Sequence, residues 1–217
     1  VSGSANELLH RIEDVLTYSQ LEEREMPDEL VGFNVKEIII PLLRDIEIKA
    51  KDKGLSFKSF IDERYDIVFM GYPERWIRII EHICDNAVKY TYSGEVSIKL
   101  DFGEDGHGIF VQINDTGVGI APERLRNIFD PFNFDTDPAL RNEGGLSLGL
   151  ALSKRIVKSM GGELKIESNI GLGSVAHVYV PFELAAIGDD EVDIDYHIAL
   201  NILVAEDNKT NQKVIKL

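Results

Sequence analysis

The sequence predicts an α+β fold: a two-layer sandwich in which helices pack against a mixed, mostly antiparallel sheet. One long amphipathic helix, residues 76–91, offers an apolar face that can cover a sheet. Several short apolar runs, separated by turn residues, have the length and alternation of strands. Because both kinds of element are apolar on one face only, we expect them to bury these faces against each other.

Two helical patterns precede the long helix. Residues 5–24 carry apolar side chains at the spacing of a helix in a bundle, with Ser4 as a suitable N-cap. Residues 34–53 form the second pattern, which contains Pro41. Proline removes one backbone N–H, so we expect a kink or a later start of this helix. Gly54 is expected to end it.

Six segments have the pattern of strands. They are residues 55–61, 67–70, 94–102, 108–114, 163–168 and 175–180. The third and fourth are joined by the turn-rich residues 103–106, as in an antiparallel pair. A further helix is expected over residues 150–160, between the fourth and fifth strands.

The long helix has two faces of different chemistry. At about 100° per residue its core face holds Trp76, Ile79, Ile80, Ile83, Ala87 and Tyr90. His82, Asn86 and Lys89 share another face roughly a quarter-turn away. An Asn amide oxygen suits the shell of a hard cation such as Mg²⁺, and the Lys suits phosphates bridged by that cation. The alternative interpretation of this face is a solvated polar edge.

Three glycine-containing segments follow. Asp115–Ile120 comes after an apolar strand and places a carboxylate beside two glycines. Gly144–Leu150 opens the helix at residues 150–160, whose N-terminal N–H groups and dipole favour phosphate. Gly171–Ser174 begins the last strand. A segment such as Asp115–Ile120, taken alone, is more often a turn.

Composition excludes several classes of function. The formal net charge of -15 argues against a general basic surface for nucleic acid or anionic membranes. The single cysteine, Cys84, excludes a disulfide framework and favours a reducing compartment. Its place beside the apolar face of the long helix indicates a packed side chain. No apolar run approaches the roughly 20 residues of a membrane-spanning helix, so we expect no direct membrane contact.

Five motifs, in this order, resemble the N, G1, F, G2 and G3 boxes of a sensor histidine kinase. They are Asn86–Thr91, Asp115–Ile120, Phe129–Phe132, Gly144–Leu150 and Gly171–Ser174. The resemblance covers roughly residues 30–184. It implies the Bergerat-type ATP-binding fold of the gyrase, chaperone, histidine kinase and mismatch-repair ATPase superfamily, with ATP and Mg²⁺ as cofactors.

The resemblance also assigns roles to individual residues. Asp115 would accept a hydrogen bond from the adenine amino group. Asn86 would complete the Mg²⁺ shell, with His82 as a second candidate, and Lys89 and Tyr90 would contact phosphate oxygens. The other implied ATP-binding residues are Gly117, Gly119, Ile120, Phe132, Gly145, Ser147, Leu148, Gly149, Leu150 and Ser174, the last supporting Asp115 through a water.

A long segment lies between Ile128 and Gly144; it contains the F box and ends where the G2 box begins. Loops of this length in compact domains are usually functional or disordered. The resemblance implies an ATP lid that Phe129 and Phe132 dock onto the core. The alternative is a surface loop held by two buried aromatic side chains.

The implied organisation has four parts. Residues 1–26 would be the second helix of a dimerisation and phosphoacceptor hairpin, and residues 27–184 the catalytic ATP-binding domain. Residues 185–197 read as an acidic linker. Residues 198–217 resemble the first strand and helix of a receiver domain, in which Glu206 and Asp207 would be the acidic pair that helps to hold Mg²⁺.

The implied activity is that of a hybrid sensor histidine kinase, which donates the γ-phosphoryl group of ATP to a histidine for phosphorelay signalling. The hairpin helix that would carry this histidine is missing here, and His10 lacks the neighbours of an acceptor. We therefore expect nucleotide binding without self-phosphorylation. Implied partners are a second copy, through the dimerisation helices, and a receiver or response-regulator domain. The implied location is the cytoplasmic part of a membrane-anchored bacterial sensor.

Some residues depart from the family pattern. Ser147 stands where glycine is usual, and Asn133-Phe134 follow the F box where a basic residue is common, leaving Arg141 as a replacement. These departures keep a second function open: a degenerate kinase-like module that regulates a partner kinase with weak or no nucleotide binding. His82 occupies the place of the glutamate general base of hydrolysing relatives, so hydrolysis is disfavoured.

A serine hydrolase is a further formal possibility, because residues 145–149 match G-x-S-x-G. That motif needs a strand entering the turn, whereas residues 135–143 are polar and irregular. The sequence therefore disfavours this reading.

Overall fold

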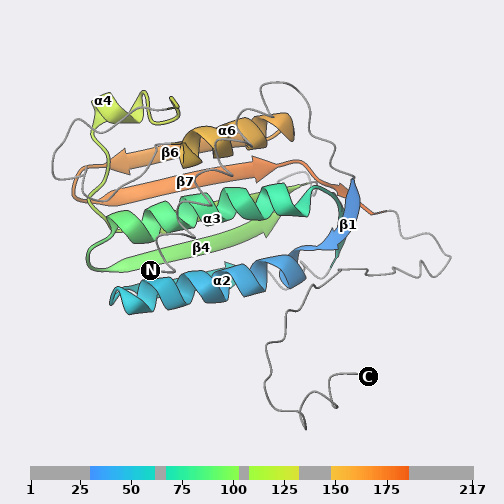
Figure 1. Cartoon of the computed structure of the whole chain (residues 1–217), viewed down its shortest axis with the longest axis horizontal. Helices are drawn as coiled ribbons and strands as arrows, with labels where there is room; N and C mark the ends of the chain where they lie inside the picture. Colours follow the sequence, from blue (N-terminus) through green and yellow to red (C-terminus); the bar gives the residue numbers. More distant parts are fainter. Residues whose placement is uncertain (1–29, 62–66, 103–107, 132–147, 186–217) are drawn as a thin grey trace, which may run out of the picture. The chain divides into compact units, whose positions relative to one another are not determined.

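A computed structural model of the chain describes residues 30–61, 67–102, 108–131 and 148–185 (Figure 1). All of these residues belong to the first of two compact units, residues 1–185, and the second unit comprises residues 186–217. No helix among the described residues is both long enough and apolar enough to cross a membrane. The helices expected at residues 5–24 and in the receiver segment lie outside the described residues.

The main sheet has five strands in the order β2-β4-β5-β7-β6. Only β2 and β4 run parallel, and the other three pairings are antiparallel. The strand bounds are Ser56–Ile61 for β2, Glu95–Phe102 for β4, Ile109–Asp115 for β5, Glu163–Asn169 for β6 and Gly173–Val180 for β7. The predicted mixed, mostly antiparallel sheet is confirmed.

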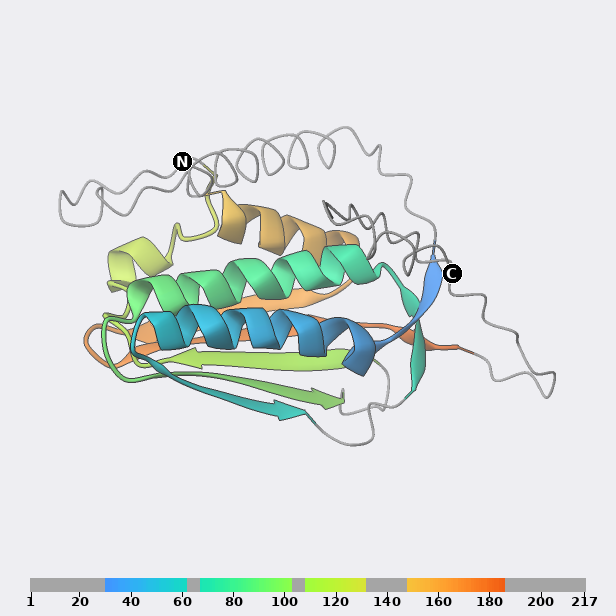
Figure 2. The ribbon, with the colours of Figure 1, turned by 60° about the horizontal axis from the view of Figure 1, so that its bottom comes forward.

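Three helices cover one face of this sheet: α2 (Val35–Asp52), α3 (Pro73–Tyr90) and α6 (Gly149–Ser159). Figures 1 and 2 show them side by side, with α3 packed between α2 and α6. A short helix, α4 (Pro122–Leu125), follows β5. The core lies between the helices and the sheet, so the two-layer α+β sandwich is also confirmed.

The central helix α3 buries the face that its periodicity predicts. Trp76, Ile79, Ile80, Ile83 and Ala87 are all buried. Tyr90 was expected on the same face but is only half-buried, because it is the last helical residue. Cys84 is fully buried, and burial raises the pKa of its thiol far above the usual range, as expected for a packed side chain.

Helix α2 corrects one expectation. It begins at Val35, before Pro41, so the later start considered from the sequence is wrong. Asn34 caps the helix, its Oδ1 accepting from the Lys36 N–H at 2.9 Å. Pro41 has no N–H to donate to the carbonyl of Glu37, four residues earlier. Both residues are exposed, so this carbonyl lies on the side of the helix that faces water.

A second, three-stranded sheet was not predicted as such. Its order is β1-β3-β8, with β1 at Val31–Asn34, β3 at Val68–Gly71 and β8 at Glu183–Leu184. Only β3 corresponds to an expected strand. The four residues of β1 and the two of β8 are too short to show a pattern. This sheet is held by aromatic packing, in which Phe182 lies 5.2 Å from Phe33 and 6.1 Å from Phe69 between ring centroids.

Candidate functional site

The C-terminal end of α3 is tied to its surroundings by its last four carbonyls. The carbonyls at a helix C-terminus lack some or all of their intrahelical donors, so they need partners from elsewhere. Thr91 Oγ1 donates to Ala87 at 2.7 Å, Lys53 Nζ to Val88 at 2.9 Å and also to Lys89, and the Val118 N–H to Tyr90 at 3.2 Å. The end of α3 is thereby joined both to α2 and to the loop after β5.

His82, Asn86 and Lys89 are half-buried on α3, as the helical spacing predicted. His82 Nδ1 lies 3.4 Å from the hydroxyl of Ser153, a buried residue of α6. A Cβ added to Gly149 would lie 3.6 Å from His82 Cγ, so the first residue of α6 packs against this ring. The structure thus brings the end of the second glycine segment next to the polar face of α3.

Lys89 turns its side chain toward the neighbouring tyrosine. Its Nζ lies 5.1 Å from the centroid of the Tyr90 ring, within the range of a cation–π contact.

Asp115, the last residue of β5, has a fixed carboxylate. Its Oδ1 accepts from the Gly117 N–H at 2.9 Å and from the Ser174 N–H at 3.2 Å. Ser174 is paired with Asp115 in the β5–β7 register, which explains this contact. Ser174 therefore supports Asp115 directly, through its backbone N–H and its side chain, whereas the sequence predicted support through a water.

Opposing effects act on the acidity of Asp115. Burial raises the pKa of this carboxyl above its ordinary value, because desolvation penalises the charged form. The hydrogen bonds from Gly117 and Ser174 lower it and offset part of this effect. The carboxylate is thus an acceptor with a fixed direction, and its burial makes the ionised form less favourable than in water.

The two glycines after Asp115 permit close approach of protein backbone. A Cβ on Gly117 would lie 2.4 Å from the Tyr90 carbonyl oxygen. A Cβ on Gly119, whose φ is +68°, would lie 2.0 Å from the Asn169 carbonyl oxygen. The sequence attributed these glycines to the approach of a ligand, and the structure adds that they let the loop pack between α3 and the turn after β6.

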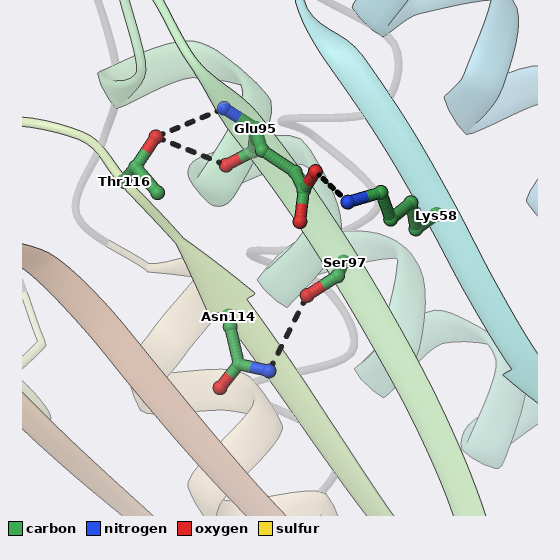
Figure 3. A network of polar contacts seen from close by, with 5 residues as sticks. All are labelled: Lys58, Glu95, Ser97, Asn114 and Thr116. Carbon is green, nitrogen blue, oxygen red and sulfur yellow. Dashed lines mark hydrogen bonds and ion pairs between the residues drawn. The ribbon is translucent and has the colours of Figure 1, made fainter.

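Thr116 clamps the other side of this loop, as Figure 3 shows. Its Oγ1 accepts from the Glu95 N–H at 2.9 Å and donates to the Glu95 carbonyl at 3.3 Å. The Glu95 carboxylate pairs with Lys58 at 2.5 Å on the neighbouring strand. Sequence analysis gave Thr116 no role, because its partner Glu95 is 21 residues away and no local pattern links the two.

Helix α6 begins beside this loop system without a side-chain cap. Leu148, at its N-cap, is buried, and Leu150 packs against the core. Phe129 also packs against the core, and Lys154 Nζ lies 4.9 Å from the centroid of its ring. Other residues of the predicted site and lid lie outside the described residues, namely Phe132, Asn133, Phe134, Arg141, Gly145 and Ser147, as do Glu206 and Asp207.

A model of the family described as histidine kinase-, DNA gyrase B- and HSP90-like ATPase matches residues 71–184, more than half of the chain. The chain belongs to this ATPase family. The matched range includes α3, the loop after Asp115 and α6, which carry the candidate site residues.

Similar proteins place this ATPase domain among sensor histidine kinases. It is 29% identical over 210 residues to sensor histidine kinase AruS of Pseudomonas aeruginosa, covering 95% of this chain and 21% of that protein. It is 31% identical over 181 residues to hybrid signal transduction histidine kinase B of Dictyostelium discoideum, covering 82% and 9%. The chain therefore spans about a fifth or less of the length of these curated relatives.

A solved structure supports the same placement. The crystal structure of full-length ShkA in complex with AMPPNP matches with a TM-score of 0.72 and 26% identity, over 84% of this chain and 37% of that one. Recognition of a sensor histidine kinase domain and of its fold from the sequence is thus confirmed.

Proposed function

We propose that this domain binds ATP and is the catalytic domain of a hybrid sensor histidine kinase. The observation that carries the proposal is the carboxylate of Asp115, held by the N–H groups of Gly117 and Ser174. A fixed, half-buried carboxylate suits the amino group of adenine as a hydrogen-bond donor. A base without this amino group would leave the carboxylate without a partner, which is costly. Ile120 and Leu148 would line the base-binding side.

The phosphate end would be formed by α3 and α6. Asn86 and Lys89 lie on the face of α3 toward which the start of α6 packs at His82, and the N-terminus of α6 supplies N–H groups and a favourable dipole. Tyr90 and the glycine segment from Gly145 to Gly149 would complete it. In phosphoryl transfer such groups position the substrate and neutralise its charge.

Mg²⁺ fits these residues. The described residues hold no cluster of three or more His, Cys, Asp or Glu side chains that could cage a metal. Mg²⁺ commonly uses one or two protein oxygens, waters and substrate phosphates, which is what the amide oxygen of Asn86 can offer, with His82 as a second candidate. When bound, the ion would neutralise charge on the β- and γ-phosphates.

The reaction of the whole protein would be transfer of the γ-phosphoryl group to a histidine on another segment. Residues 1–26 would belong to the dimerisation hairpin, and residues 198–217 to a receiver domain that takes part in the phosphorelay. The whole protein would act as a dimer on the cytoplasmic side of a membrane.

Calorimetric titration of Mg-ATP tests the proposal. We expect micromolar to submillimolar binding by the chain and none by Asp115→Ala. Asp101→Ala is the matched control, because it removes the same charge from β4, opposite Phe110, at the other end of the β4–β5 ladder. Absence of binding by the folded, unmodified chain would favour a degenerate module that regulates a partner kinase.

A further inference from the structure

We infer that Ser168 is a positioning residue for recognition of adenine: its hydroxyl ties the two ends of the loop Asp115–Ile120 together and so sets the direction of the Asp115 carboxylate. The inference rests on the proposed function. Ser168 lies on β6, outside all five motifs, so the sequence did not indicate it.

The hydroxyl of Ser168 has three described neighbours. It accepts from the Ile120 N–H at 2.8 Å, donates to the Gly173 carbonyl at 2.9 Å, and lies 3.0 Å from the Ser174 hydroxyl. A hydroxyl has one proton and two lone pairs. The Ser168 oxygen accepts from Ile120 and its proton goes to Gly173. The Ser174 hydroxyl contacts both Ser168 and the Asp115 carboxylate, so it links Ser168 to the acceptor that faces the base.

The strand register makes this arrangement continuous. Ser168 is paired with Ser174 between β6 and β7, and Ser174 is paired with Asp115 between β7 and β5. The three side chains therefore form one row across three strands. Ser174 connects the row to Asp115 through its N–H, and Ser168 connects it to Ile120.

The row closes a circuit. Asp115 begins the glycine loop and Ile120 ends it, while Ser174 and Ser168 join these two ends from outside the loop. Gly117 and Val118 hold the middle of the loop against the end of α3. Loss of the Ser168 hydroxyl leaves the Ile120 N–H without this partner and frees one end of the loop.

Loss of this hydroxyl should weaken binding of the adenine base and leave binding of the phosphates unchanged. Asp115 would keep its hydrogen bonds from Gly117 and Ser174, but the Ile120 end of its loop and the Ser174 hydroxyl would lose their contacts with Ser168. The carboxylate would then be held less tightly, so its contact with the adenine amino group would weaken. The groups of α3 and α6 proposed to bind the phosphates make no described contact with Ser168. The expected signature is therefore a loss of base discrimination.

The test compares ATP with purine riboside triphosphate, which lacks the 6-amino group. We expect the unmodified chain to prefer ATP by about tenfold or more, as sites built to bind a polar group do. Ser168→Val should reduce this preference about threefold or more. Ser168→Thr should retain it, because threonine has the shape of valine but keeps the hydroxyl. Both residues favour a strand, so the pair differs mainly in the hydroxyl.

Ser159→Ala is a matched control, because Ser159 also donates to a backbone carbonyl, that of Ile156 at 2.7 Å in α6. It should leave the preference unchanged. If Ser168→Val binds ATP with the preference of the unmodified chain, the inference is wrong and the proposed function stands. If the unmodified chain shows no ATP binding, both are overturned.

Discussion

The carbonyl oxygen of Tyr90, the last residue of α3, accepts a hydrogen bond from the Val118 N–H at 3.2 Å. This contact joins the helix that carries Asn86 and Lys89 to the loop that carries Asp115. The groups proposed for the phosphates and for the base are thus held in one frame. Three predictions concern this frame.

Gly117→Ala should destabilise the domain. The new Cβ would lie 2.4 Å from the Tyr90 carbonyl oxygen, and two backbone segments would have to separate. Overpacking of this kind costs about 1–3 kcal/mol, which urea unfolding would measure. Gly149→Ala is the control: its Cβ would meet His82 at an ordinary 3.6 Å, so stability should stay within about 0.5 kcal/mol or rise. Equal losses in the two variants would contradict the prediction.

Lys53→Met should also lower the free energy of unfolding. The Lys53 ammonium group donates to two terminal carbonyls of α3 and lies 5.1 Å from the centroid of the Tyr92 ring. Removing these contacts should cost about 1–2 kcal/mol by chemical denaturation. Lys51→Met, at an exposed i,i+4 pair with Glu47, should cost about 0.5 kcal/mol or less. A Lys53 variant as stable as the Lys51 variant would refute the capping role.

Asp115→Asn should raise the stability of the domain in a pH-dependent way while abolishing ATP binding. Burial raises the folded-state pKa of Asp115 above the ordinary 3.8, so the folded state holds this proton more tightly than the unfolded state. The wild type therefore loses stability as the pH rises from 3.8 through the raised value, and the loss is complete above it. Asn keeps an oxygen for Gly117 and Ser174 but carries no charge.

We therefore expect Asp115→Asn to be more stable than the wild type at neutral pH, with the difference shrinking as the pH falls. Urea unfolding over a pH series would measure it. The same variant should lose ATP binding, because an amide N–H would then face the adenine amino group. A stability difference that grows toward acid pH would show that the sign of the pKa shift is wrong.

Local patterns were sufficient for the elements that carry the motifs. The apolar spacing of α3 predicted which side chains are buried, because helical periodicity is a local property of the chain. The order of Asp115, Gly117 and Gly119 after a strand predicted the glycine loop for the same reason. Tyr90 deviates because it ends the helix, where the periodicity no longer determines burial.

The sequence by itself determined the α+β class, the core face of α3 and the position of the acidic and glycine residues of the candidate site. Only the tertiary structure decided how these are held. Lys53 is 35 residues from Val88, and Ile120 is 48 residues from Ser168, so no local pattern links either pair. β1 and β8 likewise exist because β3 offers them hydrogen-bonding partners. Such contacts arise when strands and helices pack, since packing brings together backbone groups that must then be paired.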